Sequence, residues 1–269
     1  MTGFQTIRYE ESEQIGTLTL ARPEKRNAQN PLMWQELSHL GEELGDGQSI
    51  RCLVVAAEGP SFSAGIDLVE GLAGALSELS ERPSDSHARE AGLKAAGTFR
   101  WIPKLNCPSI AAVRGHAYGA GLQLALACDF RIFGRSARVG LIETRYGILP
   151  DMGATVRLPR IVGESRAREL ILLGDIIDAA EALRIGLANR VVDDPEVESA
   201  AAELAARLAA QPPLAIQGAR RAIDAAWYQD PDDSFHVAVE EQIKCLASED
   251  FKEARRAMSE GRTPNWRGR

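Results

Sequence analysis

The sequence lacks several features that would assign it to a common functional class. It has no sustained basic run, and 31 lysines and arginines against 38 aspartates and glutamates give a net charge of −7. This balance argues against nucleic acid as the main partner. The longest nearly apolar stretch, residues 115–128, falls short of the roughly 20 residues that a membrane span requires. The N-terminal stretch reaches acidic residues before any apolar segment, unlike a secretory signal.

Paired cysteines and several catalytic motifs are also missing. The four cysteines stand far apart without metal-type spacing, as is typical of reduced thiols, so we expect a cytoplasmic protein without a metal site. The sequence contains no GxxxxGK[ST], GxSxG or HExxH motif. In the glycine-rich segment 119–124, Leu124 stands where a dinucleotide fingerprint has Gly or Ala. The sequence therefore lacks the motifs that would indicate a nucleotide-binding protein, a serine hydrolase or a zinc protease.

The composition is that of an ordinary globular protein. The 269 residues are 45% hydrophobic and 26% charged, which excludes a largely disordered chain. A rhythm of strand, loop and helix recurs along the first part, and every later segment has a helical pattern. We predict an α/β core over residues 1–195 and a helical C-terminal region over residues 196–269, broken at Pro212-Pro213 and Asp230-Pro231.

Hydrophobic periodicity and turn residues place the individual elements. We expect strands at 15–20, 52–57, 109–113, 130–133, 137–141 and 190–192. We expect helices at 31–44, 91–102, 122–128, 164–173 and 179–185. Residues 143–153 have an irregular pattern, and residues 71–89 are expected to form a mobile excursion that helps to select the substrate.

Two loops share one plan, in which a buried strand is followed by a glycine-containing turn and a candidate helix start. One loop contains Ala64-Gly65-Ile66-Asp67 and the other Gly119-Ala120-Gly121. Glycine lets a backbone approach a ligand closely, and the N–H groups at a helix start have no helical partner. Two such N–H groups could form an oxyanion hole. Alternatively, both segments are simply tight strand-to-helix turns.

The order of several motifs resembles the enoyl-CoA hydratase/isomerase (crotonase) family over nearly the whole chain. The matching segments are 22–28 (RPEKRNA), 62–68 (FSAGIDL), 108–115 (PSIAAVRG), 119–121 (GAG), 128–131 (CDFR), 143–153, 186–192 (GLANRVV) and 248–254 (SEDFKEA). The resemblance implies a crotonase-like spiral core of repeated strand-strand-helix units. It also implies a homotrimer or a dimer of trimers, in which the C-terminal helices mediate assembly and close the acyl pocket.

The family resemblance also assigns roles to individual positions. It implies that the backbone N–H groups of Ile66 and Ala120 hold the thioester oxygen of an acyl-CoA substrate. Asp67 is expected to shape its loop, and Lys25 and Arg26 either meet the phosphates of coenzyme A or are solvated loop cations. No cofactor is expected, because coenzyme A is part of the substrate. The residues implied to surround coenzyme A are Lys25, Arg26, Ala28, Ala64, Gly65, Asp67, Leu68 and Gly119.

The resemblance implies that Glu143 is the acid/base. Hydratases of the family use a second glutamate at the position of Gln123, and an amide cannot exchange a proton at neutral pH. Asp151 matches the aspartate of the family's dienoyl-CoA isomerases, which have a further acid at the position of Gln123. Alternatively, Asp151 caps the helix that follows it, and Glu143 is a loop carboxylate paired with Arg145.

These residues predict an acyl-CoA enzyme that shifts a double bond by carboxylate proton transfer, because Gln123 replaces a glutamate. The close alternative is an enoyl-CoA hydratase that adds water to a 2-enoyl-CoA. A non-catalytic acyl-CoA-binding protein and a hydrolase or carbon–carbon-cleaving enzyme are further alternatives.

Overall fold

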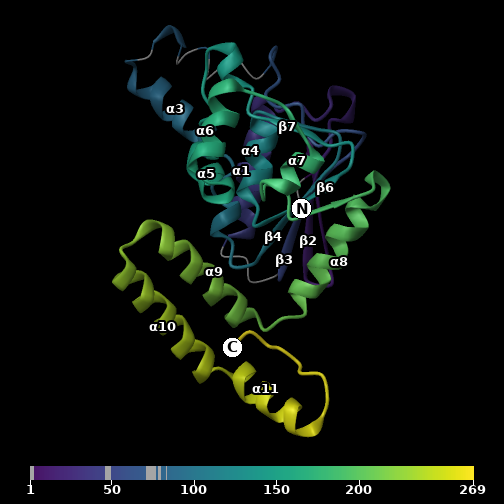
Figure 1. Ribbon diagram of the computed structural model, residues 1–269, viewed down its shortest axis with the longest axis vertical. Helices are drawn as coiled ribbons and strands as arrows, with labels where there is room; N and C mark the ends of the chain where they lie inside the picture. The colour runs from purple at the N-terminus through teal and green to yellow at the C-terminus, as the bar shows by residue number, and fades with distance from the viewer. Residues whose placement is uncertain (1–2, 46–49, 71–76, 78–79, 83) are drawn as a thin grey trace.

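The fold is built on a six-stranded sheet, seen in a computed structural model that describes residues 3–45, 50–70, 77, 80–82 and 84–269 (Figure 1). The strand order is β1-β2-β3-β4-β6-β9. β1 and β2 are antiparallel, and every later neighbour is parallel. The strands are β1 (Ile7–Ser12), β2 (Ile15–Leu20), β3 (Cys52–Ala57), β4 (Ser109–Val113), β6 (Phe130–Gly134) and β9 (Arg190–Val192). The predicted α/β class is confirmed, whereas β1 was missed.

The central strands are buried on both faces because helices cover both sides of the sheet. Along β3, Leu53 and Val55 belong to the main core, and their neighbours Cys52 and Val54 belong to a smaller cluster. This alternation follows from the two-residue period of a strand. The smaller cluster is completed by α8 (Val197–Ala209), whose alanines lie against the sheet.

A second, three-stranded sheet consists of β5 (His116–Tyr118), β7 (Arg138–Gly140) and β8 (Ile177–Asp178) in the order β5-β7-β8. Strand β5 was not predicted, because the segment after the strand at 109–113 was expected to be a glycine-containing loop. The strand is only three residues long and lies between Gly115 and Gly119, so the sequence pattern there resembles a turn. Both glycines have a positive φ in the structure.

Further helices belong to the core, and only some of them contact the large sheet (Figure 1). They are α1 (Pro31–Leu44), α3 (Ser86–Ala96), α4 (Ala120–Ala127), α5 (Ala154–Val162), α6 (Glu164–Leu173) and α7 (Ala179–Arg184). The sequence missed α5, which contains Pro159. The predicted helix 91–102 was misplaced: α3 begins at Ser86, where the Asp85 carboxylate accepts hydrogen bonds from the His87 and Ala88 N–H groups. The rest of the predicted excursion lies largely outside the described residues.

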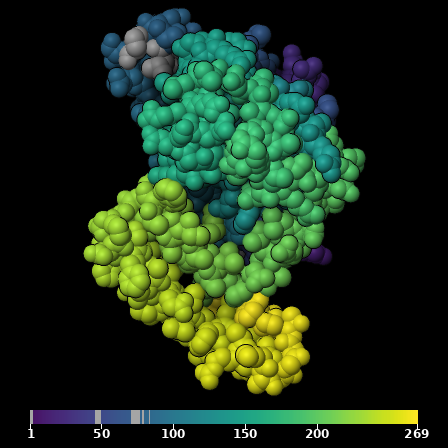
Figure 2. Space-filling view, in the orientation of Figure 1, coloured from purple at the N-terminus to yellow at the C-terminus, as the bar shows by residue number. Residues whose placement is uncertain are grey.

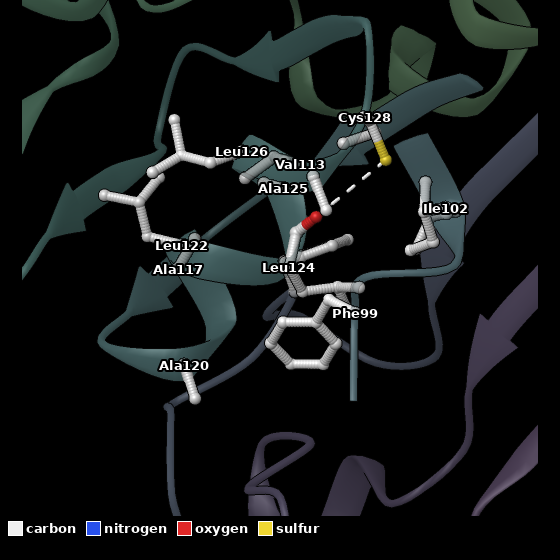
Figure 3. Close-up of a cluster of buried hydrophobic side chains, with 14 of the residues drawn as sticks. Phe99, Ile102, Val113, Ala117, Ala120, Leu122, Leu124, Ala125, Leu126 and Cys128 are labelled. Atoms are coloured by element: carbon white, nitrogen blue, oxygen red, sulfur yellow. Dashed lines mark hydrogen bonds between the residues drawn. The ribbon is translucent and has the colours of Figure 1, made fainter. Parts of the chain in front are cut away.

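Helix α4 passes through the main core, and all eight of its residues are buried. Apart from Gln123 its side chains are apolar, and such a helix is stable only when it is buried. Figure 3 shows Leu124 beside Phe99, whereas Leu122 and Leu126 project from the other side of the helix. The first turn of α4 therefore has a fixed place relative to the sheets.

Three C-terminal helices extend away from the core as one arm, α9 (Pro213–Tyr228), α10 (Pro231–Ala247) and α11 (Glu249–Glu260) (Figure 1). Arg220 joins α9 to the core through an ion pair with Asp129 and a hydrogen bond to the Pro103 carbonyl. Because α8 packs on the sheet, only α9–α11 project from it; the predicted division at residue 195 stays a prediction. None of the described helices is long and apolar enough to span a membrane.

Candidate active site

Backbone pairing brings the two glycine-containing loops into register. Ser63 forms an isolated parallel bridge with Ala117 of β5: its N–H donates to the His116 carbonyl at 2.9 Å, and the Tyr118 N–H donates to its carbonyl at 3.1 Å. Ile66 and Ala120 each lie three residues beyond this paired position. The sheet geometry thus brings the two predicted oxyanion donors to the same end of two neighbouring segments.

The N–H groups of Ile66 and Ala120 are both available to a ligand. Ile66 pairs in parallel with Gln29, which donates to the Gly65 carbonyl and accepts from the Asp67 N–H. This pattern turns the Ile66 N–H away from Gln29. Ala120 is the first residue of α4, where an N–H has no helical acceptor. Within the described part of the chain, neither group donates a backbone hydrogen bond outside regular helices and strands.

Glycines are required where these segments meet. A Cβ on Gly65 would lie 2.7 Å from the Tyr118 carbonyl oxygen, and a Cβ on Gly121 would lie 2.6 Å from the Ser63 carbonyl oxygen. Gly119 has a φ of +50°, which glycine adopts readily. The close approach of the two segments therefore depends on the absence of side chains at these positions.

Glu143 is buried beside this pair of segments. It follows β7 in the 3₁₀ turn η3 (Glu143–Tyr146), and its Oε1 lies 3.3 Å from the position of a Cβ on Gly119. Its Oε2 is buried and has no hydrogen-bond partner among the described residues. Burial raises the pKa of the Glu143 carboxyl above its usual value, and the negative charge of Asp151 adds a smaller increase. A raised pKa suits a group that must both take and return a proton.

Gln123 orients Glu143. Its Nε2 donates to Glu143 Oε1 at 2.8 Å, and its Oε1 accepts from the Ala154 N–H at 3.2 Å. The side chain is thus fixed at both ends between the start of α5 and the carboxylate. Glu143 makes no ion pair with Arg145, which pairs with Asp175 at 3.1 Å, so the interpretation of Glu143 as an Arg145 partner was wrong.

Asp151 lies just before α5 and does not cap it. The N-cap of α5 is Gly153, and no side chain accepts a capping hydrogen bond there, so the capping alternative was wrong. The Asp151 residue as a whole is exposed to solvent. Its carboxyl group is nevertheless partly surrounded by protein atoms, and this desolvation raises the pKa of Asp151. The aspartate is close enough to Glu143 for its charge to raise the pKa of that carboxyl.

The predicted coenzyme A residues lie partly at the surface, in two segments joined through their backbones, whereas Gly65, Asp67 and Gly119 are buried. The Ala64 N–H donates to the Arg26 carbonyl at 2.9 Å, joining the segment of Lys25, Arg26 and Ala28 to that of Ala64–Leu68. Lys25, Arg26 and Leu68 are exposed. Asp67 shapes its loop, and hydrogen bonds, chiefly from the Glu70 N–H, lower the pKa of its carboxyl.

The sequence analysis missed three buried residues that support this surface. Asn27 accepts from the Arg22 N–H at 2.8 Å and donates through Nδ2 to the Glu58 and Ser61 carbonyls at 2.8 and 2.9 Å. Ser63 Oγ donates to the Asn27 carbonyl at 2.8 Å. The Arg22 guanidinium donates to the Ala28 carbonyl at 2.6 Å. All three residues lie in the motif segments 22–28 and 62–68, which was the signal that the sequence offered. Asn27 has a φ of +53°, a left-handed conformation that Asn tolerates better than most residues.

Comparisons with known proteins identify the family and the fold. The sequence model of the enoyl-CoA hydratase/isomerase family matches residues 10–269. The chain is 33% identical to the crotonyl-CoA hydratase of Syntrophomonas wolfei, covering 98% of each chain. It is similar to the crystal structure of an enoyl-CoA hydratase from Bacillus anthracis, with a TM-score of 0.88, 31% identity and coverage of 98% of this chain and 100% of that one.

A Thermobifida fusca protein crystallised with acetoacetyl-CoA is also similar, with a TM-score of 0.82, 35% identity and coverage of 90% of this chain and 95% of that one. The fold is the crotonase fold, with a helical C-terminal region. The chain belongs to the enoyl-CoA hydratase/isomerase family of enzymes.

Proposed function

We propose that the protein acts on an unsaturated acyl-CoA thioester, whose carbonyl oxygen accepts hydrogen bonds from the Ile66 and Ala120 N–H groups. The support is the shared register of these two residues beside Glu143. Donors aimed at the oxygen stabilise the enolate that forms when a proton leaves the neighbouring carbon. The similar protein crystallised with acetoacetyl-CoA is consistent with this substrate class. Lys25, Arg26 and Ala28 then contact coenzyme A together with Ala64, Gly65, Asp67, Leu68 and Gly119.

The proposed reaction is a double-bond shift, and the observation that carries it is the fixation of Gln123 at both ends. In this scheme ionised Glu143 removes a proton from C2 of a 3-enoyl-CoA, and the electron pair moves into the conjugated enolate. The double bond re-forms between C2 and C3 as Glu143 returns the proton to C4. One carboxylate suffices, and no atom is gained or lost. Asp151 is the second acid for a longer shift along a 3,5-dienoyl chain.

Hydration of a 2-enoyl-CoA is the second candidate, favoured by the names of the similar proteins. In this reaction Glu143 alone activates water and supplies the proton. Gln123 has one further N–H on Nε2 with which it could orient the water. We expect this route to be slower than in an enzyme with two carboxylates, because general acid–base catalysis by one group contributes roughly 10²–10⁴-fold.

Mass-resolved product analysis with 2-enoyl-, 3-enoyl- and 3,5-dienoyl-CoA separates these functions. Rearranged products of unchanged mass support the double-bond shift, and consumption of the dienoyl substrate supports participation of Asp151. A product heavier by one water from the 2-enoyl substrate would instead identify a hydratase. Tight binding of the thioesters without any product would favour a non-catalytic acyl-CoA-binding protein. Size measurement in solution tests the proposed trimer or dimer of trimers.

A further inference from the structure

A cavity of about 500 Å³ is lined by Asp151, whose charge acts on Glu143. Met152, Gly153 and Ala127 also line it, and Ala127 lies one turn beyond Gln123 on α4. Tyr228 of α9 belongs to the same lining. In the space-filling view a hollow lies between the core and the arm that begins with α9 (Figure 2). An acyl chain whose reacting carbons face Glu143 would extend into this cavity.

The lining is partly apolar and partly charged. Phe99, Met152 and Ala127 are almost fully buried. Three cations also line the cavity: Arg157, which is half-buried, and Arg100 and Lys104, which are exposed. Among the residues that the structure describes, none of these three forms an ion pair, although Arg157 Nη1 donates to the Leu126 carbonyl at 3.3 Å. Cations without an ion-pair partner beside a cavity favour an anionic ligand group.

Two carboxylates also line the cavity and offset part of its positive charge. The charge of Asp151 acts on Glu143. Asp224 of α9 is close enough to Arg157 for the two charges to interact, but the side chains make no ion pair. Since the three cations outnumber the two acids, the lining as a whole retains positive charge.

The position of Arg157 sets the length of the chain that could join the two ends. Arg157 lies one turn beyond Ala154 on α5, and the Ala154 N–H donates to Gln123. Its guanidinium meets the Leu126 carbonyl, nearly one turn beyond Gln123 on α4. Three residues of helix rise by about 4.5 Å. A few methylene groups therefore bridge the distance from the reacting carbons to this guanidinium.

We infer that the preferred substrate is the mono-CoA thioester of a short unsaturated dicarboxylic acid, with its free carboxylate held by Arg157 and flanked by Arg100 and Lys104. This inference rests on the proposed acyl-CoA function and specifies the acyl group. The apolar walls take up the methylene groups, and the cations select against a chain that ends in a methyl group.

Calorimetric binding of two saturated probes tests the inference without depending on which reaction occurs. Hexanoyl-CoA and adipoyl-CoA have the same chain length and differ by a terminal methyl or carboxylate. We expect adipoyl-CoA to bind on the order of tenfold more tightly, the scale of one charge-assisted hydrogen bond. Equal affinities, or tighter binding of hexanoyl-CoA, would overturn the inference while leaving the acyl-CoA function intact. Binding of neither thioester would overturn both.

Variants then identify the residues responsible. The ratio of the two affinities should fall towards one in Arg157→Gln and in the double variant Arg100→Gln/Lys104→Gln. Lys94→Gln removes an exposed cation of α3 outside the cavity and should keep the wild-type ratio. A ratio that persists in both cavity variants, or that falls equally in Lys94→Gln, would contradict the assignment of the site. Circular dichroism verifies that each variant is folded.

Discussion

Gln123 fixes Glu143 by one oxygen and leaves the other without a partner. Its Nε2 donates to Glu143 Oε1 at 2.8 Å, and Glu143 Oε2 has no hydrogen bond among the described residues. Because Gln123 is itself held by the Ala154 N–H, the carboxylate plane has a defined orientation beside Gly119 and Ala120. The unpartnered oxygen is therefore the atom that we expect to exchange a proton with the substrate.

The substitution Glu143→Gln should lower kcat by roughly 10²–10⁴-fold, because the amide cannot accept or return a proton. The affinity for an acyl-CoA should change little, since the two backbone donors remain. Steady-state kinetics and calorimetric binding of the same thioester measure the two effects. Glu203→Gln, an exposed carboxylate paired with Arg190, is the matched control. Retained turnover would remove Glu143 from the proposed role.

The substitution Gln123→Glu should raise the rate of water addition to a 2-enoyl-CoA, because it supplies the second carboxylate that water activation uses. The gain should be on the order of 10²-fold, the low end of the range for general acid–base catalysis. Parallel assays of hydration and of double-bond shift provide the comparison. Equal hydration rates in the wild type and the variant would contradict the argument from the amide.

The acidic limb of the pH profile should lie above the ordinary glutamate range. Burial raises the pKa of Glu143, and only the ionised form acts as a base, so kcat/KM should fall as the pH is lowered through this raised value. Asp151→Asn should move the limb to lower pH, because the Asp151 charge contributes to the increase. Profiles of the wild type and this variant that coincide would show that the two carboxyls do not interact.

The variant Glu143→Gln should also be more stable than the wild type at neutral pH. The pKa of Glu143 is higher in the folded than in the unfolded protein, so the folded state favours the protonated carboxyl. The free energy of unfolding is therefore highest below the unfolded-state pKa, and it falls as the pH rises through the folded-state pKa. An amide does not ionise and avoids this loss. Urea unfolding at pH 7.5 should show a gain on the order of 1 kcal/mol, from the cost of an unsatisfied buried acceptor. The gain should shrink at pH 4, and a pH-independent difference would contradict this explanation.

Replacement of Gly121 by alanine should impair catalysis more than folding. Alanine is favoured over glycine in a helix by about 1 kcal/mol, but here the added Cβ would lie 2.6 Å from the Ser63 carbonyl oxygen. The two donor segments must then move apart, and loss of one oxyanion donor costs on the order of 100- to 1000-fold in rate. Kinetics together with thermal unfolding separate the two effects. Unchanged kcat would mean that the spacing of the segments is not critical.

The sequence by itself determined the buried strands and the long helices. Residues 52–57 and 109–113 form continuous apolar runs, and residues 31–44 have a helical period that begins after the capping residue Asn30. Such local patterns carry their own periodicity and end signals. The short strand β5 and the proline-containing α5 escaped prediction, because pairing with distant strands and packing stabilise them more than local preference does.

The sequence also supplied the identity of the chemical groups, but only the tertiary structure decided how they meet. The order of motifs pointed to Ile66, Ala120 and Glu143 through resemblance alone. The bridge between Ser63 and Ala117 aligns the two N–H groups, and the hydrogen bond from Gln123 orients the carboxylate. These contacts join residues far apart in the chain, so no local pattern encodes them. The burial that raises the pKa of Glu143 likewise arises only when the core closes around it.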